Sequence, residues 1–252
     1  MKMTLMYVDP MGDATDRYGA TAGLYDLMAA SSRPAQLTAV ESLLAVLRPN
    51  VGPILDLGAG SGLNTAAVLD RVPEAHLFAI EPSPSMRALI LDKLAARPDW
   101  HQRVTVRPED FFSAPLPERL GGAIILGVLG HFDAGERAAV FAEIAGRLPD
   151  GGAALFDLQP PERPRRVEPF ELTIAHIGDL AYSAIAESWP IGGDRMRWRI
   201  SYLTLEGERV LVEDTVEHEY HHPDPTAIAD EAGRADARVQ RLGESTFWLL
   251  TR

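Results

Sequence analysis

Short apolar runs alternate with amphipathic stretches from residue 50 to residue 159. The apolar runs have the length of buried strands, and the stretches between them repeat apolar side chains at helical spacing. The pattern predicts five strand-and-helix units, and hence a doubly wound, mostly parallel Rossmann-like sheet of the α/β class with helices on both faces. The expected strands are 53–58, 76–82, 103–111, 121–130 and 153–159, and the expected helices are 64–72, 83–98 and 134–148.

Different patterns flank this core. Residues 13–47 are rich in alanine and leucine and predict helices with a break near Pro34. After a proline- and charge-rich linker, residues 194–222 alternate with period two, and Met196, Trp198, Ile200 and Tyr202 share one face while Arg195, Arg197 and Arg199 share the other. This predicts an inserted antiparallel hairpin with arginine–glutamate pairs across it.

Composition and charge restrict the possible functions. The chain of 252 residues has no cysteine, which excludes disulfides, thiol nucleophiles, Cys-ligated zinc and iron–sulfur clusters. A formal net charge of −12 argues against binding nucleic acid or an anionic membrane surface. The first 13 residues lack the long apolar region of a signal peptide, and no apolar run reaches membrane-spanning length. We therefore expect a cytoplasmic protein.

A glycine-rich loop follows the first predicted strand, in the stretch PILDLGAGSGLNT (53–65). Its G-x-G-x-G spacing differs from the dinucleotide-binding G-x-G-x-x-G, which would place glycine or alanine where Leu63 stands, and no phosphate-binding G-x-x-x-x-G-K motif is present. Asp56 precedes the loop, and a carboxylate there disfavours a pyrophosphate but suits a ligand that carries positive charge.

Two further acids follow the next two predicted strands. Glu81 ends the second strand, where a carboxylate can accept hydrogen bonds from ribose hydroxyls of either NAD or S-adenosylmethionine. Asp110 ends the third strand and is followed by Phe111, which can pack on an adenine ring; Phe112 is an equally good neighbour by sequence. All three acids are expected at the carboxyl edge of one sheet, around one nucleoside-sized pocket.

These motifs, together with PSPSM (82–86) and PDGGAALF (149–156), resemble a class I S-adenosylmethionine-dependent methyltransferase of the small-molecule, natural-product type. The resemblance implies a seven-stranded sheet, S-adenosylmethionine as cofactor with S-adenosylhomocysteine as product, and four parts: an N-terminal helical lid (1–48), the cofactor-binding core (49–159), the inserted hairpin (160–225) and C-terminal strands that complete the sheet (226–252). It implies these cofactor-binding residues: Tyr18, Asp56, Leu57, Gly58, Ala59, Gly60, Gly62, Glu81, Pro82, Met86, Asp110, Phe111, Leu126 and Gly127.

Candidate catalytic residues lie on the substrate side of this pocket. His131 follows the fourth predicted strand, where its imidazole can take a proton from an acceptor hydroxyl or ammonium group, and Tyr25 of the lid is the second candidate. A histidine that only shapes the pocket is the alternative, because methyl transfer can proceed by proximity and orientation alone. The cluster His218, His221 and His222 is interpreted as a solvent-exposed hairpin end, and no metal site is expected.

The leading hypothesis is methyl transfer from S-adenosylmethionine to an oxygen, nitrogen or carbon atom of a small molecule. The alternative is a methyltransferase-like cyclase or rearrangement enzyme that binds the same cofactor without transferring its methyl group. A nicotinamide oxidoreductase is disfavoured by Asp56 and Leu63, and a non-catalytic binding protein by the three acids. The apolar hairpin face with Trp198 and Tyr202 can roof the substrate or mediate a homodimer.

Overall fold

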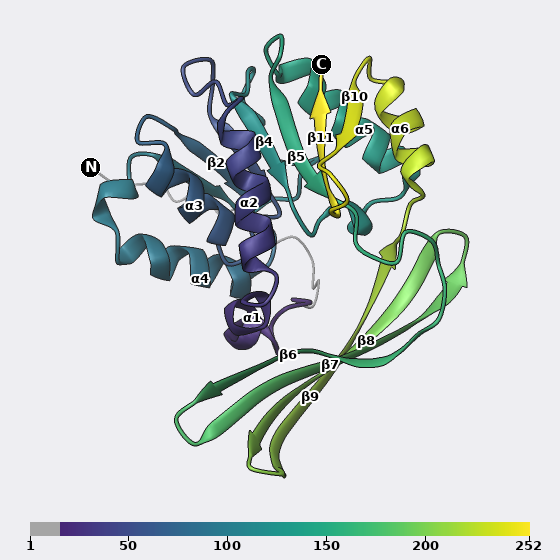
Figure 1. Ribbon diagram of the computed structural model, residues 1–252. Helices are drawn as coiled ribbons and strands as arrows, with labels where there is room; N and C mark the ends of the chain where they lie inside the picture. Colours follow the sequence, from purple (N-terminus) through teal and green to yellow (C-terminus); the bar gives the residue numbers. More distant parts are fainter. Residues whose placement is uncertain (1–15) are drawn as a thin grey trace, which may run out of the picture.

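Two β-sheets organise residues 16–252, the part of the chain that the computed structural model describes (Figure 1). The larger sheet has seven strands in the order β10-β11-β5-β4-β1-β2-β3. All neighbours run parallel except β11, which is antiparallel to both β5 and β10. The expected mostly parallel, doubly wound sheet is confirmed. Its strands are β1 (Ile54–Leu57), β2 (Leu77–Ile80), β3 (Val104–Arg107), β4 (Gly122–Ile125), β5 (Ala153–Asp157), β10 (Arg238–Arg241) and β11 (Phe247–Thr251).

Helices cover both faces of this sheet (Figure 1). One face packs against α2 and α3 through Val40, Leu43 and Val68, and the other packs against α5 and α6 through Phe141 and Ile228, all fully buried. The helices are α1 (Ala22–Ala29), α2 (Arg33–Leu44), α3 (Leu63–Arg71), α4 (Pro84–Ala95), α5 (Ala134–Arg147) and α6 (Pro225–Gly233), with short 3₁₀ turns η1 (Pro98–Trp100) and η2 (Leu129–His131).

The glycine loop between β1 and α3 needs glycine for steric reasons. Gly58 has a φ of +63°, and a Cβ placed on it would lie 2.4 Å from Val128 Cγ2, so no side chain fits there without displacing the turn after β4. Gly62 has a φ of +84° at the N-cap of α3. Left-handed backbone of this kind is open to glycine at little steric cost. The loop can therefore approach a bound ligand with its backbone.

The second sheet is antiparallel and larger than the expected hairpin. Its strands follow in the order β6 (Val167–Ile177), β7 (Leu180–Gly192), β8 (Arg195–Glu206) and β9 (Arg209–His221). The hairpin expected over residues 194–222 is present as β8 and β9. The expectation was incomplete, because two further strands, β6 and β7, belong to the same sheet. β6 and β7 were not predicted from the sequence. Two register shifts interrupt the alternation of β6, and β7 is rich in small residues.

Arginine–glutamate pairs cross this sheet, as its sequence pattern predicted. Arg197 Nη2 lies 2.6 Å from Glu219 Oε1, and Arg199 pairs with Glu217 on β9 at 2.9 Å and with Glu187 on β7 at 3.2 Å. On the opposite face Met196 and Trp198 are buried, together with Ala186 of β7. The face that carries Trp198 is thus largely covered within this chain, whereas other apolar side chains stay exposed on β6, β7 and β9: Phe170, Leu172, Ile174, Ile177, Ile185, Val210, Leu211 and Val212.

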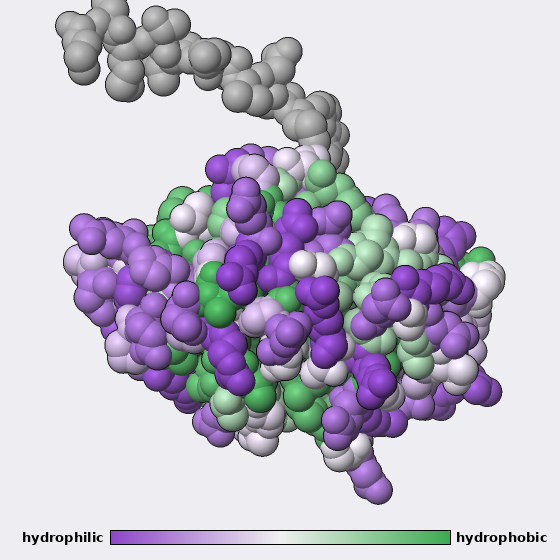
Figure 2. All heavy atoms as spheres, turned by 90° about the horizontal axis from the view of Figure 1, so that it is seen from above, coloured by the Kyte–Doolittle hydropathy of each residue, from purple (hydrophilic) through white to green (hydrophobic). Residues whose placement is uncertain are grey.

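The three helices expected in the core are present as α3, α4 and α5, and residues 108–121 between β3 and β4 form turns and loops. One further expectation needs correction: the C-terminal part begins with α6, not with a strand. Within residues 16–252, none of the helices is both long and apolar enough to cross a bilayer. Figure 2, seen from above Figure 1, shows polar residues over most of that face and apolar residues in small patches.

Candidate active site

A cavity of about 340 Å³ opens at the carboxyl edge of the parallel strands, between the ends of β1, β2 and β4 and the segment that leads into α1. It receives most of the predicted site residues, namely Tyr18, Tyr25, Leu57, Gly58, Gly60, Glu81, Pro82, Met86, Asp110, Phe111, Leu126, Gly127 and His131. Sequence reasoning missed the other residues of its wall: Asp16, Arg17, Ile80, Ser83, Pro84, Val128 and Phe132. The other predicted residues, Asp56, Ala59 and Gly62, are not among those that line it.

Glu81 joins the glycine loop to the end of β2. Its Oε2 accepts a hydrogen bond from the Gly60 N–H at 2.8 Å, and its Oε1 accepts one from the Ser83 N–H at 2.8 Å. The residue is only 5% exposed, and burial raises the pKa of its carboxyl group above the ordinary value. The lone pairs that these two bonds leave free remain available to a ligand with hydroxyl donors.

Asp56 acts on the loop from behind. It is 1% exposed, and its Oδ2 accepts a hydrogen bond from Thr65 Oγ1 of α3 at 2.6 Å. Burial raises the pKa of its carboxyl group to about 6. The side chain is not among those that line the cavity, and its hydrogen bond with Thr65 fastens the loop to α3. Its predicted contact with the cofactor stays a prediction.

Asp110 shapes the far end of the cavity. Its Oδ1 accepts hydrogen bonds from the N–H groups of Phe112 at 2.8 Å and Ser113 at 3.0 Å, and its Oδ2 accepts one from Ser113 Oγ at 2.9 Å. This turn directs Phe111, 3% exposed, into the wall and leaves Phe112 52% exposed outside it. Of the two phenylalanines that the sequence left open, Phe111 is the one that lines the cavity. We call Leu57, Gly58, Gly60, Glu81, Ser83, Met86, Asp110 and Phe111 the glycine-loop side.

Two aspartates fasten the segment around α1 to this side. Asp16 accepts hydrogen bonds from Ser83 Oγ at 2.7 Å and from the Ser85 N–H at 2.9 Å. Burial alone would raise the pKa of Asp16, but the hydrogen bonds from Ser85 and Ser83 outweigh it and lower the pKa to about 2. On α1, Asp26 accepts a hydrogen bond from Ser61 Oγ and pairs with Lys93 of α4. The helical segment thus lies directly over the loop.

Tyr25 of α1 sits above the glycine loop. A Cβ placed on Gly60 would lie 3.7 Å from the Tyr25 hydroxyl and 3.6 Å from Met86 Cε, so it would fill the space between the loop and these side chains. The Tyr25 ring meets the Tyr18 ring edge-on at 6.2 Å between centroids. Burial raises the pKa of Tyr25, so its hydroxyl stays protonated at neutral pH.

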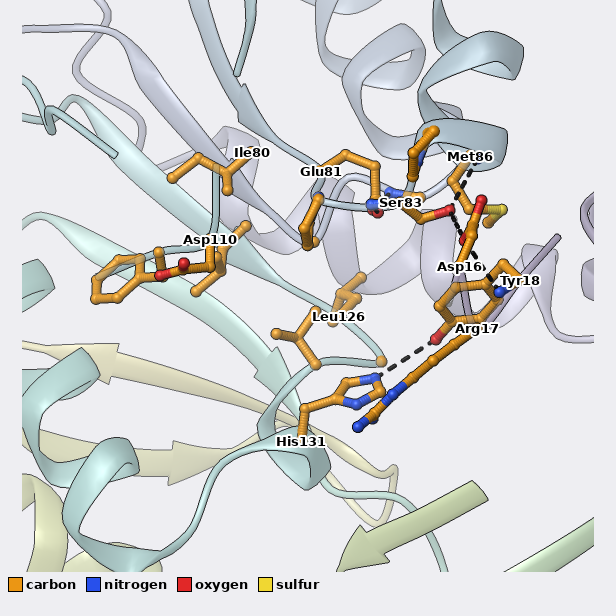
Figure 3. A pocket seen from close by; sticks show the side chains of 18 of the residues that line it. Asp16, Arg17, Tyr18, Ile80, Glu81, Ser83, Met86, Asp110, Leu126 and His131 are labelled. Atoms are coloured by element: carbon orange, nitrogen blue, oxygen red, sulfur yellow. Dashed lines mark hydrogen bonds between the residues drawn. The ribbon is translucent and has the colours of Figure 1, made fainter. Parts of the chain in front are cut away.

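The opposite wall, which we call the histidine side, consists of Arg17, Tyr18, His131 and Phe132, with His218 and Tyr220 of β9 packed against it. Tyr18 OH lies 3.4 Å from His131 Nε2, and the Arg17 side chain extends beside this pair (Figure 3). Tyr18 stacks on His218 at 5.9 Å and His131 meets Tyr220 edge-on at 4.9 Å.

His131 is neutral at physiological pH. Its pKa falls to about 4, first because the ring is buried and further because of the positive charges of Arg17 and of protonated His218. A neutral imidazole that faces a cavity can accept a proton from a bound molecule. The geometry therefore supports a general base at the position that the sequence indicated.

The histidines at the end of β9 are not solvent-exposed as expected. His218 is 9% and His222 is 2% exposed. His222 Nε2 accepts a hydrogen bond from Trp198 Nε1 at 2.9 Å, and its Nδ1–H donates to the carbonyls of Gln159 and Pro161. The burial arises because β9 returns to the core at this point. Within residues 16–252, no group of three or more His, Asp or Glu is placed to bind a metal ion.

Comparison with known proteins agrees with this arrangement. The protein-family model described as a methyltransferase domain matches residues 54–152. The type II methyltransferase M.XamI of Xanthomonas campestris pv. amaranthicola is 32% identical over 133 residues, which cover 51% of this chain and 23% of that protein. The uncharacterized methyltransferase YrrT of Bacillus subtilis strain 168 is 34% identical over 98 residues, 38% of this chain and 42% of that protein. The chain spans less than half the length of these relatives.

Solved structures share the fold over most of the chain. DesVI of Streptomyces venezuelae has a TM-score of 0.71 at 16% identity, covering 91% of this chain and 97% of its own. The sugar N-methyltransferase KedS8 from Streptoalloteichus sp. ATCC 53650 has a TM-score of 0.70 at 20% identity, covering 100% and 99%. CalS10, an amino pentose methyltransferase from Micromonospora echinaspora, has a TM-score of 0.67 at 16% identity, covering 98% and 100%. The class I methyltransferase fold is confirmed.

Proposed function

Starting from the methyltransferase domain that residues 54–152 carry, we propose that this protein is an S-adenosylmethionine-dependent methyltransferase acting on a small molecule. The observation that carries the proposal is the pairing of Glu81 with the Gly60 N–H inside a cavity whose other wall holds a neutral histidine. A glycine loop free of side chains, a buried carboxylate and an aromatic wall at Phe111 together fit a nucleoside cofactor.

The glycine-loop side is the one that holds the cofactor in this proposal. The resemblance to class I methyltransferases implies that Glu81 binds the ribose hydroxyls and that Asp110 and Phe111 hold adenine. It also implies that Asp56 and the loop backbone from Gly58 to Gly62 hold the methionine and ribose part. Met86 and Tyr25 close over the loop. When bound, S-adenosylmethionine supplies a methyl group activated by its sulfonium charge.

On the histidine side the chain positions the acceptor. Neutral His131 takes the proton that an acceptor hydroxyl or ammonium group releases, and the contact of its Nε2 with the Tyr18 hydroxyl, at 3.4 Å, orients the imidazole. The structural neighbours KedS8 and CalS10 are a sugar N-methyltransferase and an amino pentose methyltransferase. We therefore propose a small polar acceptor with an amine or hydroxyl nucleophile.

Binding and transfer are tested separately. Calorimetric titration with S-adenosylmethionine, S-adenosylhomocysteine and NADH should give micromolar binding of the first two and none of NADH. Incubation with methyl-labelled cofactor and a panel of amino sugars, hydroxylated aromatics and amino acids should yield labelled acceptor with equimolar S-adenosylhomocysteine. Product without S-adenosylhomocysteine would instead identify a rearrangement enzyme, and a preference for NADH would refute the proposal.

A further inference from the structure

One buried arginine connects the segments that form the histidine side. Arg137 lies in the first turn of α5 and is 1% exposed. Its Nε and Nη2 donate to the two carboxylate oxygens of Glu231 on α6, at 2.9 and 2.8 Å. Burying such a pair requires desolvation of both ions, and replacement by apolar side chains is often neutral or stabilising, so stability alone does not account for the pair.

The remaining donors of Arg137 reach toward the cavity wall. Arg137 Nη1 donates to the backbone carbonyl of Phe132 at 2.8 Å. Phe132 directly follows His131 and caps η2. One N–H of the guanidinium therefore holds the backbone next to His131, the proposed base.

The same guanidinium reaches the second sheet. Arg137 Nη2 lies 3.5 Å from Asp194 Oδ2 in the turn between β7 and β8. Asp194 Oδ1 in turn accepts a hydrogen bond from His221 Nδ1 at 2.7 Å, and the Asp194 carbonyl accepts one from the His222 N–H at 2.7 Å. These bonds hold the end of β9, which carries His218 and Tyr220.

The two segments held in this way touch each other. A Cβ placed on Gly130 in η2 would lie 3.1 Å from the His221 carbonyl oxygen and 3.4 Å from Tyr220 Cβ, so the η2 backbone rests directly on β9. His131 meets Tyr220 and Tyr18 meets His218 immediately beyond this contact. We infer that Arg137 is a positioning residue, which sets the spacing between His131 and the β9 side chains and so shapes the acceptor side of the cavity.

This inference deepens the proposed function and rests on it for its effect on catalysis, but it can be tested without an acceptor. The key variant combines Arg137→Met with Glu231→Leu, so that no buried charge is left unpaired. If the pair is purely structural, this variant should keep the kcat and the His131 titration of the parent. If Arg137 positions His131, the variant should fold but with His131 displaced. Asp194→Asn gives a milder test, because it weakens only the link to β9. Glu143→Gln is the control, since it breaks a pair with Arg147 on the same helix in which the Glu143 side chain is 48% exposed.

Three measurements distinguish the outcomes. We expect the double variant to unfold at a denaturant concentration equal to or above that of the parent, and to bind S-adenosylhomocysteine within about threefold of it. Its kcat should fall about 10- to 100-fold, as a misplacement on the order of 1 Å produces, and Asp194→Asn should show a smaller loss. Titration of carbon-13-labelled histidine by NMR should move the pKa of His131 up from about 4 toward its ordinary value.

An unchanged His131 titration together with unchanged kcat in the folded double variant would overturn the inference. Failure of the parent protein to bind S-adenosylhomocysteine would refute the proposed function, and the NMR titration would still decide the role of Arg137.

Discussion

The two sides of the cavity differ in how the chain builds them. The glycine-loop side comes from the ends of neighbouring parallel strands, and its contacts are backbone N–H groups held by side chains such as Glu81 and Asp110. The histidine side brings together Tyr18 from before α1, His131 from η2 and His218 with Tyr220 from β9, contacts that span up to about 200 residues of sequence.

The two sides are therefore positioned by different interactions. The position of the glycine-loop side follows from the register of β1 with β2, which is fixed by hydrogen bonds. The histidine side depends on how the second sheet docks on the core, through the contacts around Asp194 and His222, the packing of η2 on β9 and the stacking of Tyr18 on His218. Each side should therefore respond to substitution on its own, and the changes below test that independence.

The largest effect is expected at His131. Replacement by alanine removes the proposed base, so kcat should fall about 10²- to 10⁴-fold, while calorimetric affinity for S-adenosylhomocysteine stays at the parent value. His101→Ala, on the exposed surface, is the matched control. A parallel loss of cofactor affinity would show that the two sides are not independent.

The pH dependence of the same histidine gives a second readout. Because its pKa is lowered to about 4 in the folded protein against 6.5 for the free side chain, the unfolded state binds the extra proton first as pH falls. Its contribution to stability is thus fully present above pH 6.5 and is lost between pH 6.5 and 4. The difference in unfolding free energy between parent and His131→Ala, followed from pH 7 to pH 4, should show this loss.

A comparable loss, confined to binding, is expected at Glu81. Glu81→Ala removes the carboxylate proposed to hold the ribose hydroxyls and the acceptor for the Gly60 and Ser83 N–H groups. It should weaken S-adenosylhomocysteine binding about 100-fold, because hydrogen bonds to charged groups contribute about 1.5–3 kcal/mol each. Glu109→Gln, at the pair with Arg107 outside the cavity, is the control. The tyrosine and histidine contacts across the cavity should be unaffected, which NMR of labelled histidine can check.

Asp56 should show an effect on stability rather than on binding. Its pKa is raised from 3.8 to about 6, so the folded state holds the proton more tightly and its stability falls as pH rises from about 4 to 6. Asp56→Asn removes this penalty and should raise the unfolding free energy at pH 7.5 by about 1–3 kcal/mol, measured by urea denaturation at pH 4 and pH 7.5. Exposed Asp150→Asn should leave it unchanged. A lower stability of Asp56→Asn at pH 7.5 would contradict the assignment.

The smallest effect is expected on the outer face of the second sheet. Arg197→Ala breaks a pair with Glu219 in which both side chains are about 40% exposed, and exposed pairs contribute little to stability. The melting temperature and cofactor affinity should be indistinguishable from those of the parent in 0.5 M salt. A clear loss of kcat would mean that this face takes part in positioning β9.

Sequence reasoning located the glycine-loop side well because its residues follow strands directly. An acid at the end of each buried run predicted Glu81 and Asp110, and the G-x-G-x-G spacing after the first run predicted the loop. It failed for Asp16 and Arg17, since nothing in their neighbourhood signals that the chain folds back over α4. It also failed for His218 and His222, because period-two alternation shows which residues share a face but not which face meets the core. β6 was missed where its register shifts break the period.

His222 has a consequence for how such a protein can diversify. The chain leaves the core after Gln159 and returns to it at His222, at the end of β9. The His222 ring connects these two points by hydrogen bonds to the carbonyls of Gln159 and Pro161. An insertion whose ends meet imposes little loop-closure cost on the fold that hosts it, and that cost grows only slowly with length. Because its two ends meet at His222, the second sheet can be lengthened or trimmed at its far end with little effect on the folding of the core.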